Sequence, residues 1–209
     1  MRRSLKKIIL ASKSIDRSEM FNRAGIKFET FRTDIEEEKY KLAILDGIKL
    51  VKELAKAKAL LAKKKLINQK ENAIIVAADT IVDLDGKIIG KAQNEVEAFE
   101  ILKKMMGRTH KLITGMAITE IKTSKLVVDS DITLVEFLEL SDKEIRNYIK
   151  SNEWKGRAGA YSIRDKASLF IKKINGSSSN VIGLSMHKLY LILKKEFQTD
   201  LFLLGENFI

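Results

Sequence analysis

A carboxylate beside an apolar run is the first candidate for chemistry in this sequence. Asp79 follows the apolar residues 73–78 and precedes Thr80. A run that is short, apolar and rich in branched side chains indicates a buried strand, and open α/β sheets bind their ligands where strands end. We therefore expect Asp79 at a strand end within a binding or catalytic site. The alternative is an aspartate that only begins a turn.

A lysine is expected to reach the same place through a hairpin. Residues 85–86 are Asp-Gly between alternating apolar residues, which indicates a two-residue turn. Such a turn pairs Leu84 with Lys87. Counting outward then places Thr80 opposite Lys91, so that an ammonium and a carboxylate converge at one end of the hairpin. A single β-bulge would instead move Lys91 to the other face.

A second lysine lies on a predicted helix. Residues 42–66 repeat apolar side chains at helical spacing, and Lys58 falls on the apolar face. Four other lysines of this segment fall on the opposite face, which we interpret as solvated surface. Two interpretations of Lys58 remain open: its amine enters the site, or its stem lies at the edge of the apolar face with the amine in solvent.

The N-terminal segment supplies hydroxyl groups at a predicted strand-to-helix junction. Residues 8–11 indicate a short strand, and the helix that follows ends near Gly25. Ser12, Ser14 and the backbone N–H groups of the junction suit an anion, because the helix dipole and its unpaired donors point there. Arg17 can add a forked contact to a phosphate. The alternative is an ordinary helix start that one of the serines caps.

Eight short motifs give the chain a resemblance to a known family. They occur in the order found in the Maf family of nucleoside triphosphate pyrophosphatases, which are related in fold to the inosine triphosphate pyrophosphatases. The resemblance covers about residues 7–195. The motifs are 11–17 (ASKSIDR), 35–37 (IEE), 54–59 (LAKAKA), 78–82 (ADTIV), 90–91 (GK), 110–115 (HKLITG), 158–161 (AGAY) and 174–184 (INGSSSNVIGL).

The resemblance implies an enzyme that cleaves a nucleoside triphosphate between its α and β phosphates, releasing the monophosphate and pyrophosphate. It implies a divalent metal cofactor, Mg²⁺ or Mn²⁺. Asp79 matches the family's catalytic carboxylate, which accepts a proton from water. Lys58 and Lys91 match its phosphate-binding lysines. Glu37 matches an acidic residue of the site that, together with Asp79, would hold the metal.

The substrate-binding residues are implied in the same way. Ser12 and Arg17 match the phosphate-binding first loop, and Thr80 matches a threonine found in members that prefer dTTP and UTP. Arg157 stands where the family commonly has lysine and keeps its charge. These matches favour dTTP, UTP and related or modified pyrimidine nucleotides as substrates.

Two positions depart from that pattern. The members that prefer dTTP and UTP carry Arg where this chain has Asp16, and Gln where it has Arg164. The branch specific for 7-methyl-GTP fits worse, since it has Trp, Gln and Glu at positions 16, 80 and 164. We hypothesise that Asp16 and Arg164 pair across the base pocket, so that an arginine reaches the base from the other side.

Composition separates several classes of protein. The formal net charge is +11 and the sequence pI is about 9.6, which favours nucleic-acid binding as a rival function. Aromatic residues are only 7% of the chain and do not alternate with the basic ones, so we expect no nucleic-acid partner. A second rival is a nucleotide-binding regulator of cell division that has lost turnover.

The sequence also supports expectations about the metal, the cellular location and the partners. The chain has no Cys and two His, which argues against a zinc site, and we interpret His110 as a residue that supports the fold. No apolar run is long enough to span a membrane, so we expect a cytoplasmic protein. The nucleotide is the expected partner, and a homodimer is left open.

The order of predicted elements indicates an α/β fold. We expect a mixed, twisted sheet flanked by helices, with two lobes around a central cleft. Residues 1–197 should form a single domain, and 198–209 a C-terminal tail. Strands are expected at 8–11, 27–32, 74–90 as a hairpin, 111–121, 126–136 and about 168–174; helices are expected up to residue 25 and at 42–66, 95–106, 141–151 and 185–197.

Overall fold

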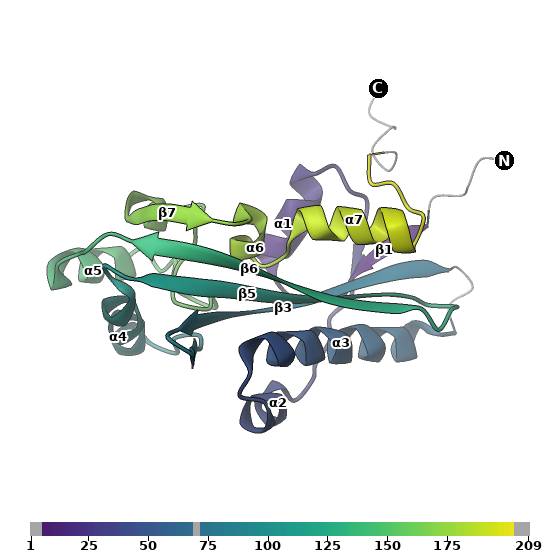
Figure 1. Ribbon diagram of the computed structural model, residues 1–209, viewed down its shortest axis with the longest axis horizontal. Helices are drawn as coiled ribbons and strands as arrows, with labels where there is room; N and C mark the ends of the chain where they lie inside the picture. The colour runs from purple at the N-terminus through teal and green to yellow at the C-terminus, as the bar shows by residue number, and fades with distance from the viewer. Residues whose placement is uncertain (1–5, 69–71, 203–209) are drawn as a thin grey trace.

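A mixed sheet flanked by helices forms the body of the protein (Figure 1). The computed structural model describes residues 6–68 and 72–202. The strand order is β2-β1-β3-β5-β6-β7, and β4 pairs with β3 off this path. Strand β1 pairs in parallel with β2 and β3, and the other pairings are antiparallel. The expected mixed α/β fold is confirmed.

The elements follow one another in an irregular alternation. The strands are β1 (Lys7–Leu10), β2 (Glu29–Thr30), β3 (Ala73–Leu84), β4 (Lys87–Ile89), β5 (Thr109–Glu120), β6 (Leu126–Phe137) and β7 (Ile171–Asn175). The helices are α1 (Ile15–Arg23), α2 (Glu37–Ala43), α3 (Gly47–Leu66), α4 (Glu95–Met105), α5 (Asp142–Ile149), α6 (Ser178–Ile182) and α7 (Met186–Glu196), with a 3₁₀ turn η1 (Lys166–Leu169) before β7.

Helices cover both faces of the sheet (Figure 1). The side chains of a strand alternate between its faces, and β3 follows this rule. Ile75 and Ala77 face α3, whereas Ile74 and Val76 join the apolar core under α1 and α7. A third large core lies at the other end of the sheet and includes side chains from α4 and α5. We call the end of the sheet covered by α1, α3 and α7 the first lobe, and the end that carries α4 and α5 the second lobe.

The helix expected over residues 42–66 is in fact two helices. Helix α2 ends one residue before Ile44, whose backbone is extended. Helix α3 begins after Asp46, which accepts a hydrogen bond of 2.7 Å from the backbone N–H of Lys49. Aspartate is a strong helix-capping residue. It starts a new helix at a point where the apolar repeat continues without interruption, which is why periodicity alone gave one helix.

Strand β3 continues past Asp79, so the expectation of a strand end at this residue was wrong. Strand β5 pairs with β3 on one side from Ile74 to Asp83. On the other side β1 pairs only as far as Val76, and β4 pairs from Val82 onward. This leaves a gap along one edge of β3, over residues 77–81. The strand that ends at the site is β1, not β3.

The hairpin is confirmed in its register but not in its reach. Leu84 pairs with Lys87 as expected. Strand β4 ends at Ile89, however, and Lys91 instead forms an isolated antiparallel bridge with Ala158. Thr80 lies opposite Thr114 of β5. Lys91 therefore pairs with Ala158, from the segment after α5, and not with Thr80 of β3 as the count of pairs had placed it.

Two smaller expectations concern the ends of the fold. The strand expected over 27–32 is reduced to Glu29–Thr30. In the expected tail, Leu201 packs on the core under α1 and α7, and residues 203–209 lie outside the described residues. Among the helices that the structure describes, none is long and apolar enough to cross a membrane.

Helix α3 lies so close to β5 that Gly115 has no room for a side chain. A Cβ atom at this position would lie 2.3 Å from the carbonyl oxygen of Val51. Gly115 is also the β5 partner of Asp79. The glycine therefore sets the height of α3 above the strand at the point where Lys58 must reach Asp79.

We expect Gly115→Ala to lower the free energy of unfolding by about 1–3 kcal/mol, because overpacking forces the backbone to shift. Urea denaturation measures this change. Gly90→Ala is the matched control, since a Cβ at Gly90 meets no atom within 4 Å and should alter the free energy by less than about 0.5 kcal/mol. Equal effects of the two substitutions would contradict the close approach.

The core of the second lobe contains a neutral histidine. His110 is 1% exposed, and its Nε2 lies 3.0 Å from the hydroxyl oxygen of Tyr161. Its ring packs edge-on against Phe137, with 4.7 Å between centroids. Burial lowers the pKa of His110 to about 4. The structure thus places His110 in the core, as we interpreted it from the sequence.

This histidine should make stability depend on pH. In the unfolded chain its pKa is about 6.5, so stability from the neutral ring is complete above that pH and is lost as the pH falls toward 4. We expect the free energy of unfolding to fall by about 2 kcal/mol between pH 7 and pH 5 on this account. His110→Gln should remove that part of the slope, whereas a variant of the exposed His187 should retain it. An unchanged slope in His110→Gln would refute the assignment.

Candidate active site

The gap along β3 presents two polar side chains to opposite faces of the sheet. Asp79 follows Ile75 and Ala77 in the alternation and points toward α3. Thr80 follows Val76 and Ala78 and points toward α6. The pairings and contacts below confirm this separation. The strand thus distributes one acid and one hydroxyl to two different clusters.

The first cluster is centred on Lys58. Its Nζ lies 2.5 Å from Oδ1 of Asp79 and 2.7 Å from Oε1 of Glu37. The side chains of Lys58 and Asp79 are only 12% and 13% exposed. Of the two interpretations of Lys58, the one that sends its amine into the site is therefore correct. Glu37 begins helix α2, so the break before α3 is what brings it back over Lys58.

The pKa of Glu37 depends on its burial and on the charged side chains around it. Burial raises the pKa of this carboxyl, but the hydrogen bond and charge of Lys58, together with the charges of Lys41 and Lys91, hold its pKa below the usual value. Lys91 is exposed and acts here through its charge. It approaches the Glu37 side of the site from the segment that follows β4.

The second cluster surrounds Arg17. Its Nε donates to the carbonyl oxygen of Gly183 at 2.7 Å. Its Nη1 donates to Oγ of Ser12 at 3.2 Å, and its Nη2 to Oγ1 of Thr80 at 3.0 Å. A guanidinium has five N–H groups, so these contacts leave two of them for a ligand, as far as the described residues show. Gly183 has φ 125°, a conformation that favours glycine.

Ser12 is arranged as a donor toward the site. Its Oγ accepts from Arg17 and also from the backbone N–H of Ser14 at 3.1 Å. A hydroxyl has two lone pairs and one hydrogen, so its hydrogen is left without an acceptor within residues 6–68 and 72–202. Ser14 caps helix α1 by accepting from the N–H of Arg17 at 3.4 Å. The capping interpretation is therefore correct for Ser14, and anion binding by Ser12 stays a prediction.

Arg17 connects the clusters electrostatically. Burial lowers its pKa from the usual value, and the charges of Asp79, Glu37 and Asp16 oppose that effect. A buried cation is stable only with such partners. The site consequently carries Arg17, Lys58 and Lys91 around two carboxylates, and this cationic excess suits an anionic ligand.

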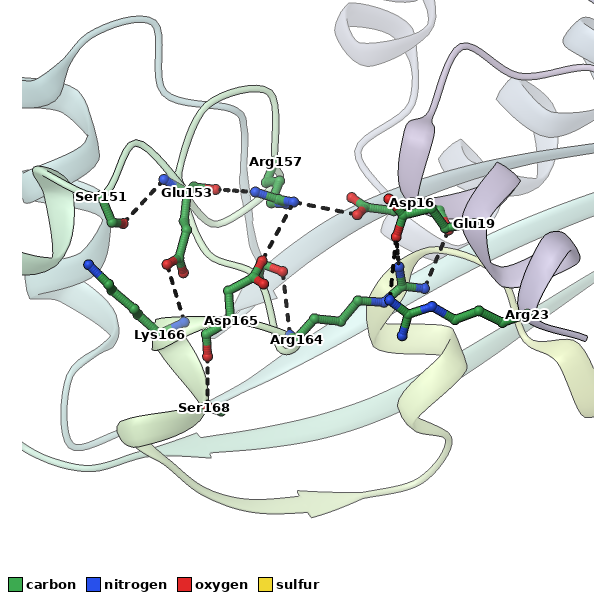
Figure 2. A network of polar contacts seen from close by, with 11 residues as sticks. Asp16, Glu19, Arg23, Ser151, Glu153, Arg157, Arg164, Asp165, Lys166 and Ser168 are labelled. Carbon is green, nitrogen blue, oxygen red and sulfur yellow. Dashed lines mark hydrogen bonds and ion pairs between the residues drawn. The ribbon is translucent and has the colours of Figure 1, made fainter.

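Asp16 and Arg164 do not pair through their side chains, so that hypothesis was wrong. Figure 2 shows the acids of α1 facing arginines from the segment after α5. Nη1 of Arg164 lies 2.5 Å from Oε2 of Glu19, and Nη2 donates to the backbone oxygen of Asp16 at 3.5 Å. The Asp16 carboxylate instead lies 3.4 Å from Nη2 of Arg157. Glu19, one turn further along the helix, has a longer side chain than aspartate and forms the ion pair with Arg164.

Arg157 is fixed from its own side as well. Its Nη1 donates to the carbonyl oxygen of Glu153 at 2.6 Å, and its Nη2 lies 4.0 Å from Asp165 (Figure 2). Arg157 and Arg164 together therefore tie α1, on the first lobe, to residues 153–165 of the second. The structure does not bring either arginine into contact with Asp79 or Lys58.

Glu37 and Asp79 are the site's metal-ligand candidates. Across the parts of the chain that the structure describes, no group of three or more His, Cys, Asp or Glu could hold a metal ion. Magnesium is commonly bound by one or two carboxylates with substrate phosphates as further ligands. The two carboxylates converge on one ammonium, within 2.7 Å of it. This donor set fits a hard cation that a phosphate helps to hold.

Sequence reasoning missed four contributors to these networks. Glu19 was not singled out from the sequence. Thr114 and Asn180 are buried polar residues: Thr114 forms hydrogen bonds with Thr80 and with the backbone oxygen of Asn180. Gly183 supplies a carbonyl oxygen to Arg17. The last three lie within the quoted motifs, and a fully buried threonine in an apolar strand was the signal that could have identified Thr114.

The ion pairs between α1 and the second lobe should be measurable in a double-mutant cycle. For Glu19→Gln and Arg164→Gln we expect a coupling of up to about 1 kcal/mol in the free energy of unfolding, decreasing in high salt, because the pair is partly exposed. The exposed pair Lys103–Asp142 is the control and should couple more weakly. A coupling no larger than the control would show that the tie contributes nothing.

Comparisons with known proteins identify a family and several named relatives of this chain. A family model described as Maf-like protein matches residues 7–196. A dTTP/UTP pyrophosphatase of Alkaliphilus oremlandii is 41% identical over 197 residues, which cover 94% of this chain and 100% of that protein. Proteins of the same name from Caldanaerobacter subterraneus subsp. tengcongensis (42% identical, 91% and 89% covered) and Clostridium botulinum strain Eklund 17B / Type B (39%, 90% and 98%) are similar.

A solved structure was also found, a nucleoside-triphosphatase / dITP/XTP pyrophosphatase from Mycobacterium abscessus. It is 13% identical, covers 63% of this chain and 72% of its own, and has a TM-score of 0.34, which is too low to support an inference. The family model and the relatives are sufficient without it. Both span nearly the whole chain, the range of the family model includes every residue of the two clusters, and this protein belongs to the Maf-like protein family.

Proposed function

We propose that this protein hydrolyses nucleoside triphosphates to the monophosphate and pyrophosphate, with dTTP and UTP as preferred substrates. The name dTTP/UTP pyrophosphatase of relatives 39–42% identical to it supports the choice of reaction and base. The observation that carries the proposal is the ammonium of Lys58 held between Glu37 and Asp79, close to the charge of the half-buried Arg17.

The cations of the site would bind the triphosphate. Such a ligand carries about four negative charges, which must be neutralised as charge develops on the leaving oxygens. Arg17 offers its two remaining N–H groups, and Ser12 offers its hydroxyl hydrogen, as derived above. Lys58 and Lys91 lie on the other side of the gap and add positive charge next to Glu37.

Asp79 would be the proton acceptor. Its Oδ1 is fixed by Lys58, and its Oδ2 makes no hydrogen bond to any described residue. That free oxygen can accept a proton from a water molecule as the water oxygen bonds to phosphorus. The phosphorus–oxygen bond between the α and β phosphates breaks, and pyrophosphate departs with the bonding electrons.

A divalent cation belongs to this proposal. Glu37 and Asp79, with phosphate oxygens, would hold Mg²⁺ or Mn²⁺. When bound, the ion would neutralise charge on the phosphates that leave. We further propose that the enzyme acts in the cytoplasm, where its nucleotide substrates are found.

Asp79→Asn tests the proposal directly. We expect pyrophosphate release from dTTP or UTP, with Mg²⁺ or Mn²⁺, to fall at least about 10²-fold in this variant, because the amide cannot accept the proton. The matched control is Asp83→Asn, four residues along the same strand. Asp83 accepts a hydrogen bond from the backbone of Gly86, which asparagine can also accept, so this variant should keep its activity.

Three results would contradict the proposal. Equal rates for Asp79→Asn and the wild type would exclude Asp79 as the base. Nucleotide binding without pyrophosphate release would favour a regulator that has lost turnover. Salt-sensitive DNA binding, again without pyrophosphate release, would favour the nucleic-acid-binding alternative. A panel that includes CTP, GTP and 7-methyl-GTP would establish the preferred base.

A further inference from the structure

A chain of hydroxyls leads from Arg17 through the half-buried Thr80 to the buried Thr114 in the interior of the sheet. Arg17 Nη2 lies 3.0 Å from Thr80 Oγ1, which lies 2.9 Å from Thr114 Oγ1. Thr114 Oγ1 in turn lies 3.1 Å from the backbone oxygen of Asn180. Thr114 and Asn180 are both 0% exposed. The chain is continuous and ends at an acceptor that has no proton to give.

The two ends of the chain constrain the direction of the hydrogen bonds between them. Arg17 can only donate, and a carbonyl oxygen can only accept. Thr114 therefore gives its hydrogen to Asn180, and Thr80 gives its hydrogen to Thr114. Thr80 has a second acceptor, the carbonyl oxygen of Gly183 at 3.3 Å, but its contact with Thr114 is shorter at 2.9 Å. Thr80 thus accepts from Arg17 while its own proton points away from the site.

The far end of the chain is held firmly. Nδ2 of Asn180 donates to the backbone oxygen of Leu112 at 3.2 Å and to Oγ1 of Thr133 at 3.1 Å. These contacts fix α6 to strands β5 and β6. The same short segment ends at Gly183, which binds Arg17 directly. Asn180 therefore anchors both the hydroxyl chain and the carbonyl that orient the guanidinium.

We infer that Thr114 is a positioning residue, which acts through Thr80 to aim the guanidinium of Arg17 at the phosphates of the substrate. This inference rests on the proposed function, because it assumes a phosphorylated ligand at Arg17. One consequence separates the two hydroxyls of the site. Ser12 can donate a hydrogen to a phosphate, whereas the hydrogen of Thr80 is taken up inside the protein, by Thr114 or by the carbonyl oxygen of Gly183.

The test compares two buried threonines of the same strand. Thr114→Val removes the hydroxyl from the chain. Thr119→Val is the matched control, because Thr119 is also 0% exposed but donates to the backbone oxygen of Lys125, away from Arg17. Thr114→Ser keeps a hydroxyl at position 114 and should rescue the loss.

For Thr114→Val we expect KM for the preferred nucleotide to rise about tenfold, with a smaller change in kcat, as for one weakened charge-assisted hydrogen bond. Thr119→Val should leave KM unchanged. A purely structural role would instead reduce the amount of folded enzyme, lowering the apparent kcat of both valine variants with KM constant. That pattern, or a failure of Thr114→Ser to restore KM, would overturn the inference.

Binding of inorganic triphosphate, measured by calorimetry, separates this inference from the proposed function. Thr114→Val should weaken that binding about tenfold, even if the wild type hydrolyses none of the nucleotides. In a protein that already carries Arg17→Lys, adding Thr114→Val should weaken triphosphate binding no further, because the hydroxyl chain acts only through the guanidinium. Additive losses, or no binding by the wild type, would refute the positioning role.

Discussion

The shared ammonium of Lys58 is the contact on which the rest of the site depends. Two carboxylates this close repel each other unless a cation lies between them. Lys58 can occupy that place only because α3 runs close above β5, and the close approach requires Gly115. The position of α2 depends on it too, since α2 carries Glu37 to the same ammonium. A packing constraint between helix and strand thus becomes a constraint on charge.

Arg17 is the corresponding element on the other face of β3. It is half-buried, and the chain surrounds it from distant segments with acceptors and acids: Ser12, Thr80 and Gly183 as acceptors, and Asp79, Glu37 and Asp16 as charges. A long strand passes between the two cations. Its alternation, rather than any loop, keeps Asp79 with one and Thr80 with the other.

Much of this was readable from the sequence, and the failures have physical causes. The apolar run, the Asp-Gly turn and the helical spacing of Lys58 are local signals; they predicted β3, the hairpin register and the apolar helix face that carries Lys58, but left open where its amine goes. The end of β3 was misjudged because an apolar-to-polar change need not end a strand that a neighbour continues to pair. The Asp16–Arg164 pair failed because Glu19 competes for Arg164, a three-dimensional choice that no spacing reveals.

The gap along β3 also has a consequence for how the protein folds. Strands β3, β5 and β6 are joined by antiparallel pairings between near neighbours in the chain, whereas β1 must cross α1, β2, α2 and α3 before it can pair in parallel with β3. Closing that long loop is slow compared with forming local pairs. We therefore expect the antiparallel part of the sheet to form before the N-terminal strand docks, and Ser12 and Arg17 to reach Asp79 only at that step. In this order of events, the site is assembled only when the N-terminal strand has docked.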